Sequence, residues 1–424
     1  MSAQISRRTV LAAGGAVAAG VVLPAGTAAA GGRPPTTVPF RLGARTLDGG
    51  EQVTSLTLDT SRLGPIDPAS LTTGTFVVHA RATSPIPLEE GEVDLSTYDV
   101  DRSVTAARLD RRGNVVLDLE SVEGQVGGGT LGYILSRGRN VRLDLAYTVT
   151  QQRPVMRRDR RPVSIGELVQ GELTNPEVDA FTHGVSSSGM KYRLYSPPRR
   201  GRGGGRGKRP LVVWLHGGGE GASLADGYYD NETTLRANRG ALGFATEEAQ
   251  RIFGGAHVVA PQSTSFWMED GDRFAPMIRE IVEDVVREHD VDRDRVYLVG
   301  CSNGGYMTMK MTAEYPELFA AAVPICGVVQ PFGEATTPLI PDDRLAAITT
   351  PTWLVASRDD GTVPPLANTA HAHELIRDSL MTLYDTVTWD GHRFDGHWSW
   401  IYVARNDPQH RGTPIWQWMA SQRR

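Results

Sequence analysis

The chain has 424 residues, of which 40% are hydrophobic and 22% are charged, and its formal net charge is −5. The length suggests two or three ordinary globular domains. The weak acidity gives no reason to expect nucleic acid or an anionic membrane surface as a partner. The only two cysteines, Cys301 and Cys326, are too few for a disulfide framework or a cysteine-rich zinc site.

Residues 1–30 have the pattern of a twin-arginine signal peptide. Ser6-Arg7-Arg8-Thr9-Val10-Leu11 leads into a short uncharged stretch rich in Gly and Ala, and the small residues that follow predict cleavage after Ala30. An uncleaved anchor is the weaker alternative, because the stretch is short for a membrane span. We therefore predict a secreted protein without stable membrane insertion. Export would permit a Cys301–Cys326 disulfide, and two buried free thiols fit the sequence equally well.

Residues 31–165 are predicted to form an all-β sandwich. In VRLDLAYTV (141–149) apolar and polar residues alternate, which indicates a strand with one buried face. Further strands are expected in VTSLTLDT (53–60), TFVVHARA (75–82) and NVVLDLE (114–120), with turn-forming clusters between them. The basic, proline-containing segment 152–162 indicates a linker or an exposed edge.

Residues 166–424 show a different pattern, in which apolar strands alternate with helices. Strands are predicted in KYRLYSP, LVVWL, AHVVAPQ, RVYLVG, AAAVPICG and PTWLVAS, and helices at 274–289, 304–316 and 368–381. Such continuous apolar runs are typical of a mostly parallel, doubly wound α/β sheet covered on both faces. The Arg-Gly loop at 199–209 lacks the aromatic residues of RNA-binding tracts, so we expect a flexible surface hairpin.

A serine between glycines follows the strand RVYLVG. Gly300-Cys301-Ser302-Asn303-Gly304 matches the G-x-S-x-G pattern, and it lies between a predicted buried strand and a predicted helix. That context presents the serine hydroxyl at the carboxyl edge of the sheet, next to the positive end of a helix. Ser302 is therefore the candidate nucleophile. The alternative is a glycine-rich turn that only packs the helix on the strand.

A nucleophilic serine needs a base and an acid that orients the base. The loop after TWLVAS carries Asp359 and Asp360, and we favour Asp360 as the acid, with Asp359 as the runner-up. A late loop, WDGHRFDGHWSW, offers His392 and His397. We favour His397 as the base, because Trp398 and Trp400 follow it and would wall a substrate site.

Backbone donors for an oxyanion are expected from LHGGGEG (215–221) and from the residue after the nucleophile. The predicted pair is the N–H of Gly218 and the N–H of Asn303. His216 in the same loop is interpreted as a structural residue. Trp267, after the strand AHVVAP, is a candidate substrate contact, with a core tryptophan as the equal alternative.

The segment from about 175 to the end resembles a secreted α/β-hydrolase esterase. It is similar to the polyhydroxybutyrate depolymerase and feruloyl esterase group, and to bacterial esterases with an immunoglobulin-like domain in front. Such sequences are also grouped with prolyl-oligopeptidase-like serine peptidases. The matching segments are LHGGGEG, APQS, DRVYLVGCSNGGYMT, YPELFAAAVPICG, SRDDGTVP and GHWSW. The resemblance implies the same Ser302, Asp360 and His397, and an immunoglobulin-like sandwich before the α/β-hydrolase domain.

These observations predict a serine hydrolase that cleaves small or polymeric carboxylic esters through an acyl-enzyme, with no cofactor and no metal. The alternatives are a peptidase with the same triad, a polyester depolymerase, and a binding protein whose hydrolase domain is inert. No polymer-binding segment is recognised after His397, which weighs against a dedicated depolymerase. Self-association and the role of the sandwich stay open.

Overall fold

The computed structural model of the protein describes residues 36–163, 165–198 and 207–424. The predicted signal peptide and most of the Arg-Gly loop therefore lie outside the described residues. In the part of the chain that is described, no helix combines the length and the apolar character needed to cross a membrane.

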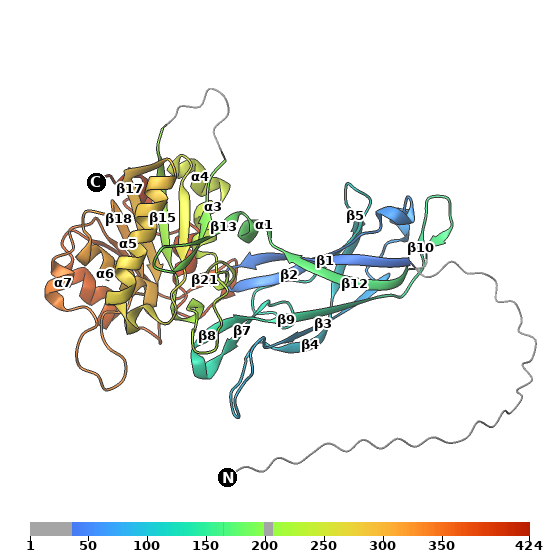
Figure 1. The fold of residues 1–424 in the computed structure, drawn as a ribbon, viewed down its shortest axis with the longest axis horizontal. Coiled ribbons are helices and arrows are strands. Elements are labelled where there is room, and N and C mark those ends of the chain that lie inside the picture. The colour runs from blue at the N-terminus through green and yellow to red at the C-terminus, as the bar shows by residue number, and fades with distance from the viewer. Residues whose placement is uncertain (1–35, 164, 199–206) are drawn as a thin grey trace, which may run out of the picture. The chain divides into compact units, whose positions relative to one another are not determined.

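The first part of the chain forms two sheets around one apolar core (Figure 1). One sheet has the order β12-β1-β2-β6-β5, and the other has the order β4-β3-β9. The strands are β1 (Thr36–Leu47), β2 (Gly50–Leu58), β3 (Phe76–Thr83), β4 (Tyr98–Arg102), β5 (Val104–Leu109), β6 (Val115–Leu119), β9 (Asp144–Gln151) and β12 (Ile165–Thr174). Phe40 and Leu117 from one sheet share the core with Val78 and Tyr147 from the other, so both sheets bury one face, as the alternating pattern predicted.

Three details of this region differ from the sequence prediction. The segment 141–149 divides at Leu143 between β8 (Arg139–Arg142), which pairs with β7 (Leu131–Ile134), and β9, which pairs with β3. β12 pairs in parallel with β1, so the first sheet continues to Thr174, past the expected boundary at 165. Two short strands, β10 (Val155–Met156) and β11 (Pro162–Val163), form a hairpin inside the predicted linker.

The second part of the chain is built on an eight-stranded sheet with the order β13-β14-β16-β15-β17-β18-β19-β20. β14 runs antiparallel to both of its neighbours, and the strands from β16 to β20 are parallel to one another. The bounds are β13 (Phe181–Val185), β14 (Lys191–Tyr195), β15 (Arg209–Leu215), β16 (His257–Pro261), β17 (Val291–Cys301), β18 (Ala321–Ile325), β19 (Trp353–Ser357) and β20 (Leu380–Tyr384).

Helices cover both faces of this sheet (Figure 1). Successive residues of β15 enter different cores: Val212 and Trp214 pack in one, and Leu211 and Val213 in the other. The first core includes residues of α3 (Gly240–Ala245), α4 (Glu247–Phe253), α9 (Trp400–Ala404) and α10 (Ile415–Ser421). The second includes residues of α5 (Gly271–Glu288), α6 (Asn303–Glu314), α7 (Asp342–Ala346) and α8 (His371–Leu375). Apolar runs in the strands therefore reflect burial on both faces.

The helix predicted at 368–381 is wrong in its second half. A π-helical turn at Leu366–Ala370 leads into α8, which ends at Leu375, and the chain reverses at Asp378, where φ is 57°. The following residues form β20 because they pair with β19. The remaining short elements are α1 (Pro176–Asp179), α2 (Thr233–Arg236) and the hairpins β21 (Thr388–Trp389) with β22 (His392–Arg393) and β23 (Gln409–His410) with β24 (Thr413–Pro414).

Candidate active site

Ser302 occupies the sharp turn between β17 and α6. Its backbone has φ 53° and ψ −115°, a conformation that a residue with a side chain rarely adopts. Its N–H donates a 2.8 Å hydrogen bond to the Ile325 carbonyl at the end of β18, which holds the turn against the sheet. Strained backbone of this kind persists only where the surrounding structure enforces it, and it is concentrated at functional sites.

The two glycines of the motif are required by close backbone contacts. A Cβ on Gly300 would lie 2.4 Å from the Gly304 carbonyl oxygen. A Cβ on Gly304 would lie 2.0 Å from the Leu215 carbonyl oxygen at the end of β15. Only glycine lets the first turn of α6 approach β15 and β17 this closely. The spacing in G-x-S-x-G is thus explained by packing around the serine.

Asp360 and His397 form a buried hydrogen-bonded pair. The Nδ1 atom of His397 lies 2.8 Å from Oδ2 of Asp360, and the other carboxylate oxygen accepts hydrogen bonds from the N–H groups of Thr362 and Val363. These contacts fix the carboxylate, and the carboxylate in turn orients the ring. Nδ1–H then donates to the acid, and Nε2 is left as the basic nitrogen.

The alternatives for acid and base lie in other surroundings. Asp359 accepts hydrogen bonds from the Ser357 hydroxyl and, at 3.0 Å, from Arg393. His392 lies in the hairpin β21–β22, where its ring packs on Phe394 with 4.6 Å between ring centroids. The choice of Asp360 over Asp359, and of His397 over His392, therefore agrees with this geometry.

Cys326 connects the serine turn to the acid–base pair. It follows Ile325, the residue that accepts the Ser302 N–H, and its backbone has a φ of 39°. Its Sγ, a ring nitrogen of His397 and a carboxylate oxygen of Asp360 all lie within 4.8 Å of one another. Ser302, Cys326 and Asp360 therefore lie just beyond the carboxyl ends of three adjacent strands, β17, β18 and β19, and His397 reaches Asp360 from a later loop.

Within the described residues, the grouping whose donor atoms could hold a metal ion consists of Cys326, Asp360 and His397. Sulfur, nitrogen and oxygen are donors that Zn²⁺ accepts. The imidazole–carboxylate hydrogen bond already satisfies two of these groups, so the arrangement can work as an acid–base pair by itself.

The surroundings of His397 act on its pKa in opposite directions. Burial lowers the pKa of the imidazole, while the sulfur of Cys326 and the carboxylate of Asp360 raise it, and the net shift is upward. The carboxylate contributes because it stabilises the imidazolium form. This pair can accept a proton from a serine hydroxyl and hold it as imidazolium.

Gly218 and Asn303 lie near one another, as predicted for oxyanion donors. Each is the first residue of a helical turn, so its N–H has no partner inside that turn. A Cβ on Gly218 would lie 3.7 Å from Nδ2 of Asn303. The Asn303 side chain is buried, and its Oδ1 accepts a hydrogen bond from the Met268 N–H, which ties the start of α6 to the segment after β16.

His216 has a structural position. Its Nδ1–H donates to the Gly217 carbonyl at 2.6 Å, and its Nε2 accepts from the Ser263 N–H at 3.1 Å. Burial lowers the pKa of this imidazole to about 4, so the ring is neutral at physiological pH. It holds the loop 215–221, which is predicted to supply an oxyanion donor and is called the oxyanion loop below, against the segment after β16.

Trp267 is a core residue and not a surface on which substrate can lie. Its side chain is fully buried, and its Nε1–H donates to the His216 carbonyl at 3.0 Å. The partly exposed aromatic residue is its neighbour Phe266, whose ring lies 2.7 Å from the position of a Cβ on Gly218. Trp267 begins a 3₁₀ turn, and Phe266 directly precedes that turn. The two neighbouring side chains point in different directions, so Trp267 enters the core and Phe266 stays partly exposed.

Trp400 lies beside His397, and Trp398 stacks on Trp400. The Trp400 ring meets the imidazole edge to face, with 5.6 Å between centroids, and the Trp398 ring stacks on Trp400 at 5.9 Å. Trp398 is half-buried and lies against Gly49 of the N-terminal sheets. It therefore supports the histidine loop from the side of the first region.

Both cysteines are free and buried, which is one of the two states that the sequence allowed, and Cys326 lies beside Asp360 and His397. The sequence analysis missed the place of Cys326 in the site, and it missed Glu220. Glu220, in the oxyanion loop, is also buried, and burial raises the pKa of its carboxyl to about 7. The only signal for Glu220 was an acidic residue within the glycine-rich LHGGGEG segment.

A solved structure similar to this chain covers nearly the whole molecule. This structure, of a thermostable esterase, superposes with a TM-score of 0.71 over 91% of this chain and 99% of that one, at 24% identity. The match shows a shared fold. A model of the prolyl oligopeptidase family matches residues 265–341.

Curated relatives match parts of the chain. Poly(3-hydroxyalkanoate) depolymerase C of Paucimonas lemoignei is 38% identical over 84 residues, which are 17% of this chain and 20% of that protein. An acetylxylan esterase of Coprinopsis cinerea is 28% identical over 177 residues, 42% of this chain and 44% of that protein. The chain thus spans less than half the length of the curated relatives it matches.

Proposed function

We propose that the protein is a serine hydrolase that cleaves carboxylic esters through an acyl-enzyme, with Ser302, Asp360 and His397 as its triad. One observation carries this proposal: a strained serine lies at the same sheet edge as a buried imidazole–carboxylate pair, linked to it through Ile325 and Cys326. This is the combination of nucleophile, base and orienting acid that acyl transfer requires. The esterases among the similar proteins support the choice of esters.

In the first half-reaction, Ser302 Oγ attacks the ester carbonyl carbon while His397 Nε2 takes the hydroxyl proton. Asp360 keeps the ring in the tautomer that leaves Nε2 basic, and it stabilises the imidazolium that forms. The alcohol leaves with the proton held by His397. Water then attacks the acyl-enzyme, again giving a proton to Nε2, and Ser302 is regenerated.

The negative oxygen of both tetrahedral intermediates needs donors that are already in place. We assign these to the N–H groups of Gly218 and Asn303, which begin their helical turns without internal partners. The positive end of α6 adds to this stabilisation. We assign Trp398 to the wall of the site and Phe266 to the position that Trp267 was expected to hold.

Labelling with a fluorophosphonate tests the activated serine directly. The adduct is expected on Ser302 in the parent, strongly reduced in His397→Ala and absent in Ser302→Ala, with turnover of 4-nitrophenyl acetate following the same order. His392→Ala serves as the matched histidine control and is expected to stay close to the parent. Folded protein without an adduct and without ester turnover would overturn the proposal and favour a binding protein.

A serine peptidase with the same triad is the second candidate, because the prolyl oligopeptidase model matches residues 265–341. An amide requires protonation of a poorer leaving group, so ester and amide rates separate the two activities. We expect 4-nitrophenyl acetate to be hydrolysed far faster than an aminoacyl 4-nitroanilide. The reverse ranking would establish the peptidase.

Polyester hydrolysis is a further candidate, since one relative is named as a poly(3-hydroxyalkanoate) depolymerase. Clearing of a poly(3-hydroxybutyrate) suspension measures it. We expect soluble esters to be preferred, because the match to that relative covers only 20% of its length.

We also propose export by the twin-arginine route and an immunoglobulin-like class for the two N-terminal sheets. The sequence Ser6-Arg7-Arg8 supports the export route, and the shared apolar core of two antiparallel-rich sheets supports a sandwich. Replacing Arg7 and Arg8 by Lys should retain the protein in the cell. Sequencing the amino terminus of the exported protein should find a start after Ala30.

A further inference from the structure

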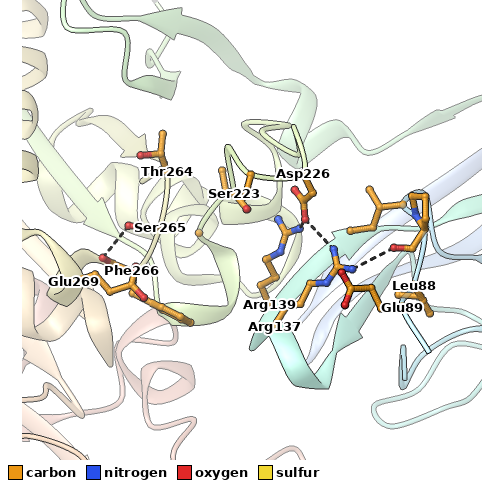
Figure 2. A pocket seen from close by; sticks show the side chains of 16 residues that line it. Leu88, Glu89, Arg137, Arg139, Ser223, Asp226, Thr264, Ser265, Phe266 and Glu269 are labelled. Atoms are coloured by element: carbon orange, nitrogen blue, oxygen red, sulfur yellow. Dashed lines mark hydrogen bonds and ion pairs between the residues drawn. The ribbon is translucent and has the colours of Figure 1, made fainter. Parts of the chain in front are cut away.

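A cavity of about 710 Å³ opens between the oxyanion loop and the N-terminal sheets (Figure 2). Its volume falls in the range of small-molecule sites. The N-terminal region contributes the 86–89 loop, Arg137 and Arg139. The second part of the chain, which follows Thr174 and is called the hydrolase region below, contributes Gly218, residues 221–226 and residues 264–266, among others. The cavity is therefore built from both parts of the chain.

The cavity begins at the proposed oxyanion hole. Gly218 lines it, and the Phe266 ring lies directly against this glycine. The tip of the same ring lies 3.4 Å from the position of a Cβ on Gly138, which belongs to the N-terminal region. Phe266 thus forms a wall shared by both regions. A group bound here would be the part of the substrate next to the reacting carbonyl.

Arg139 supplies a buried donor that lacks a partner. Its side chain is 6% exposed, and it forms an ion pair with Asp226. In the described residues its Nη1 has no hydrogen-bond partner. A buried N–H without an acceptor is unfavourable by about 1–3 kcal/mol, so a ligand oxygen at this position would be favoured. Figure 2 shows Arg139 and Arg137 side by side, both directed at Asp226.

The charge of the lining disfavours an anionic ligand. Arg137 is already paired with Glu92 at 2.5 Å and with Asp226 at 3.0 Å. Glu89 and Glu269 add two carboxylates to the same cavity. Three carboxylates against two guanidinium groups would repel an anion. A purely apolar ligand would leave the Arg139 donor unpaired.

The remaining chemistry fits a neutral group with several hydroxyls. Its oxygens can accept from Arg139, its hydroxyl protons can be donated to the carboxylates, and its C–H face can lie on Phe266 and Leu88. We propose that this cavity binds the sugar portion of an ester substrate, one or two rings long, as the alcohol side of the ester. This inference rests on the proposed esterase function and adds a substrate class to it.

Filling the cavity tests this assignment. Ala225 is exposed and lines the cavity, so Ala225→Trp occupies its space without disturbing a core. The matched control is Ala347→Trp, an exposed alanine after α7. We expect Ala225→Trp to lower kcat/KM for mono-O-acetylated xylobiose at least tenfold more than for 4-nitrophenyl acetate, and Ala347→Trp to change neither. Equal losses on both substrates, or a parent that prefers hexyl acetate to the acetylated sugar, would overturn the proposal.

Binding without turnover separates this inference from the proposed function. Saturation-transfer NMR with xylotriose should give a signal with Ser302→Ala and lose it in the Ser302→Ala, Ala225→Trp double variant. No signal, or the same signal in both, would overturn the sugar site. A signal in Ser302→Ala from a parent that hydrolyses no ester would retain the sugar site and reject the esterase.

Discussion

The N-terminal sheets and the eight-stranded sheet differ in where they keep their polar groups. In the eight-stranded sheet both faces are apolar, and Ser302 and Asp360 of the proposed triad lie just beyond the strand ends. The N-terminal region instead buries charged groups where it meets the hydrolase region. Glu51, at the start of β2, is fully buried and pairs with Arg236 of α2. One region thus carries the side chains of the proposed triad, and the other is joined to it by specific polar contacts.

The junction contains several such contacts. Glu51 also accepts a hydrogen bond at 2.7 Å from Asn175, where the two regions join, and one at 2.6 Å from Thr130 of its own region. Asp48 pairs with Arg405, close to the end of α9. Apolar burial tolerates many arrangements, whereas a buried ion pair requires its partner in one place. These contacts therefore hold the two regions in a defined register.

The largest expected effect is on the acid of the triad. Asp360→Asn should lower kcat for 4-nitrophenyl acetate by roughly 10⁴, because the imidazole loses the partner that fixes its tautomer. Asp359→Asn, next in the chain, should lower kcat by less than about tenfold, since its contacts are to Ser357 and Arg393. Steady-state kinetics with a circular dichroism check of folding measures both. Equal losses would reject Asp360 as the specific acid.

The next effect is on stability at the junction. Glu51→Ala would strand three buried donors and should lower the free energy of unfolding by about 3–5 kcal/mol. The comparison variant is Glu283→Ala, which removes the exposed ion pair with Arg279 and should change stability by less than about 1 kcal/mol. Urea denaturation measures both. A Glu51 variant as stable as the Glu283 variant would mean that the junction does not depend on this ion pair.

A smaller effect concerns Glu220 and pH. Burial raises the pKa of its carboxyl from 4.5 to about 7, so the folded state holds this proton more tightly than the unfolded chain. The stability it contributes is complete below about pH 4.5 and is lost as the pH rises through about 7. Between about pH 4 and pH 8, the parent should lose on the order of 2–3 kcal/mol relative to Glu220→Gln.

Urea denaturation at several pH values measures this difference. The exposed Glu248→Gln, in the first turn of α4, is the control and should follow the parent at every pH. If Glu220→Gln also follows the parent, the Glu220 carboxyl does not carry a raised pKa.

The smallest expected effect sharpens the link between the two regions. Asn140 of β8 donates a 3.1 Å hydrogen bond to the Gly219 carbonyl in the oxyanion loop. Asn140→Ala should lower kcat roughly tenfold with little change in KM, because a misplaced oxyanion donor weakens the transition state most. Asn114→Ala, which removes a hydrogen bond to Asp110 in the N-terminal region, should leave kcat unchanged. A change in KM alone would mean that Asn140 affects substrate binding and not oxyanion alignment.

Much of the fold and the proposed triad could be predicted because they depend on local patterns. Alternation in 141–149 and continuous apolar runs such as LVVWL report burial directly. Ser302, Asp360 and His397 each follow a strand or sit in a late loop with a recognisable motif. The prediction of a helix at 368–381 was wrong in its second half, because pairing with β19 outweighed the helical pattern of that segment.

The strand and helix periods, the glycines that permit the Ser302 turn and the residue types needed for acyl transfer can all be read from the amino-acid order. The core position of Trp267, the burial of Cys326 and Glu220 close to the site, and the place of Arg139 in a cavity shared with the oxyanion loop became known from the folded chain. These two groups of properties differ in the range of the interactions that set them. Periodicity and backbone conformation are set by neighbours along the chain, whereas burial, pKa and cavity walls depend on segments that are distant in sequence and meet only after folding.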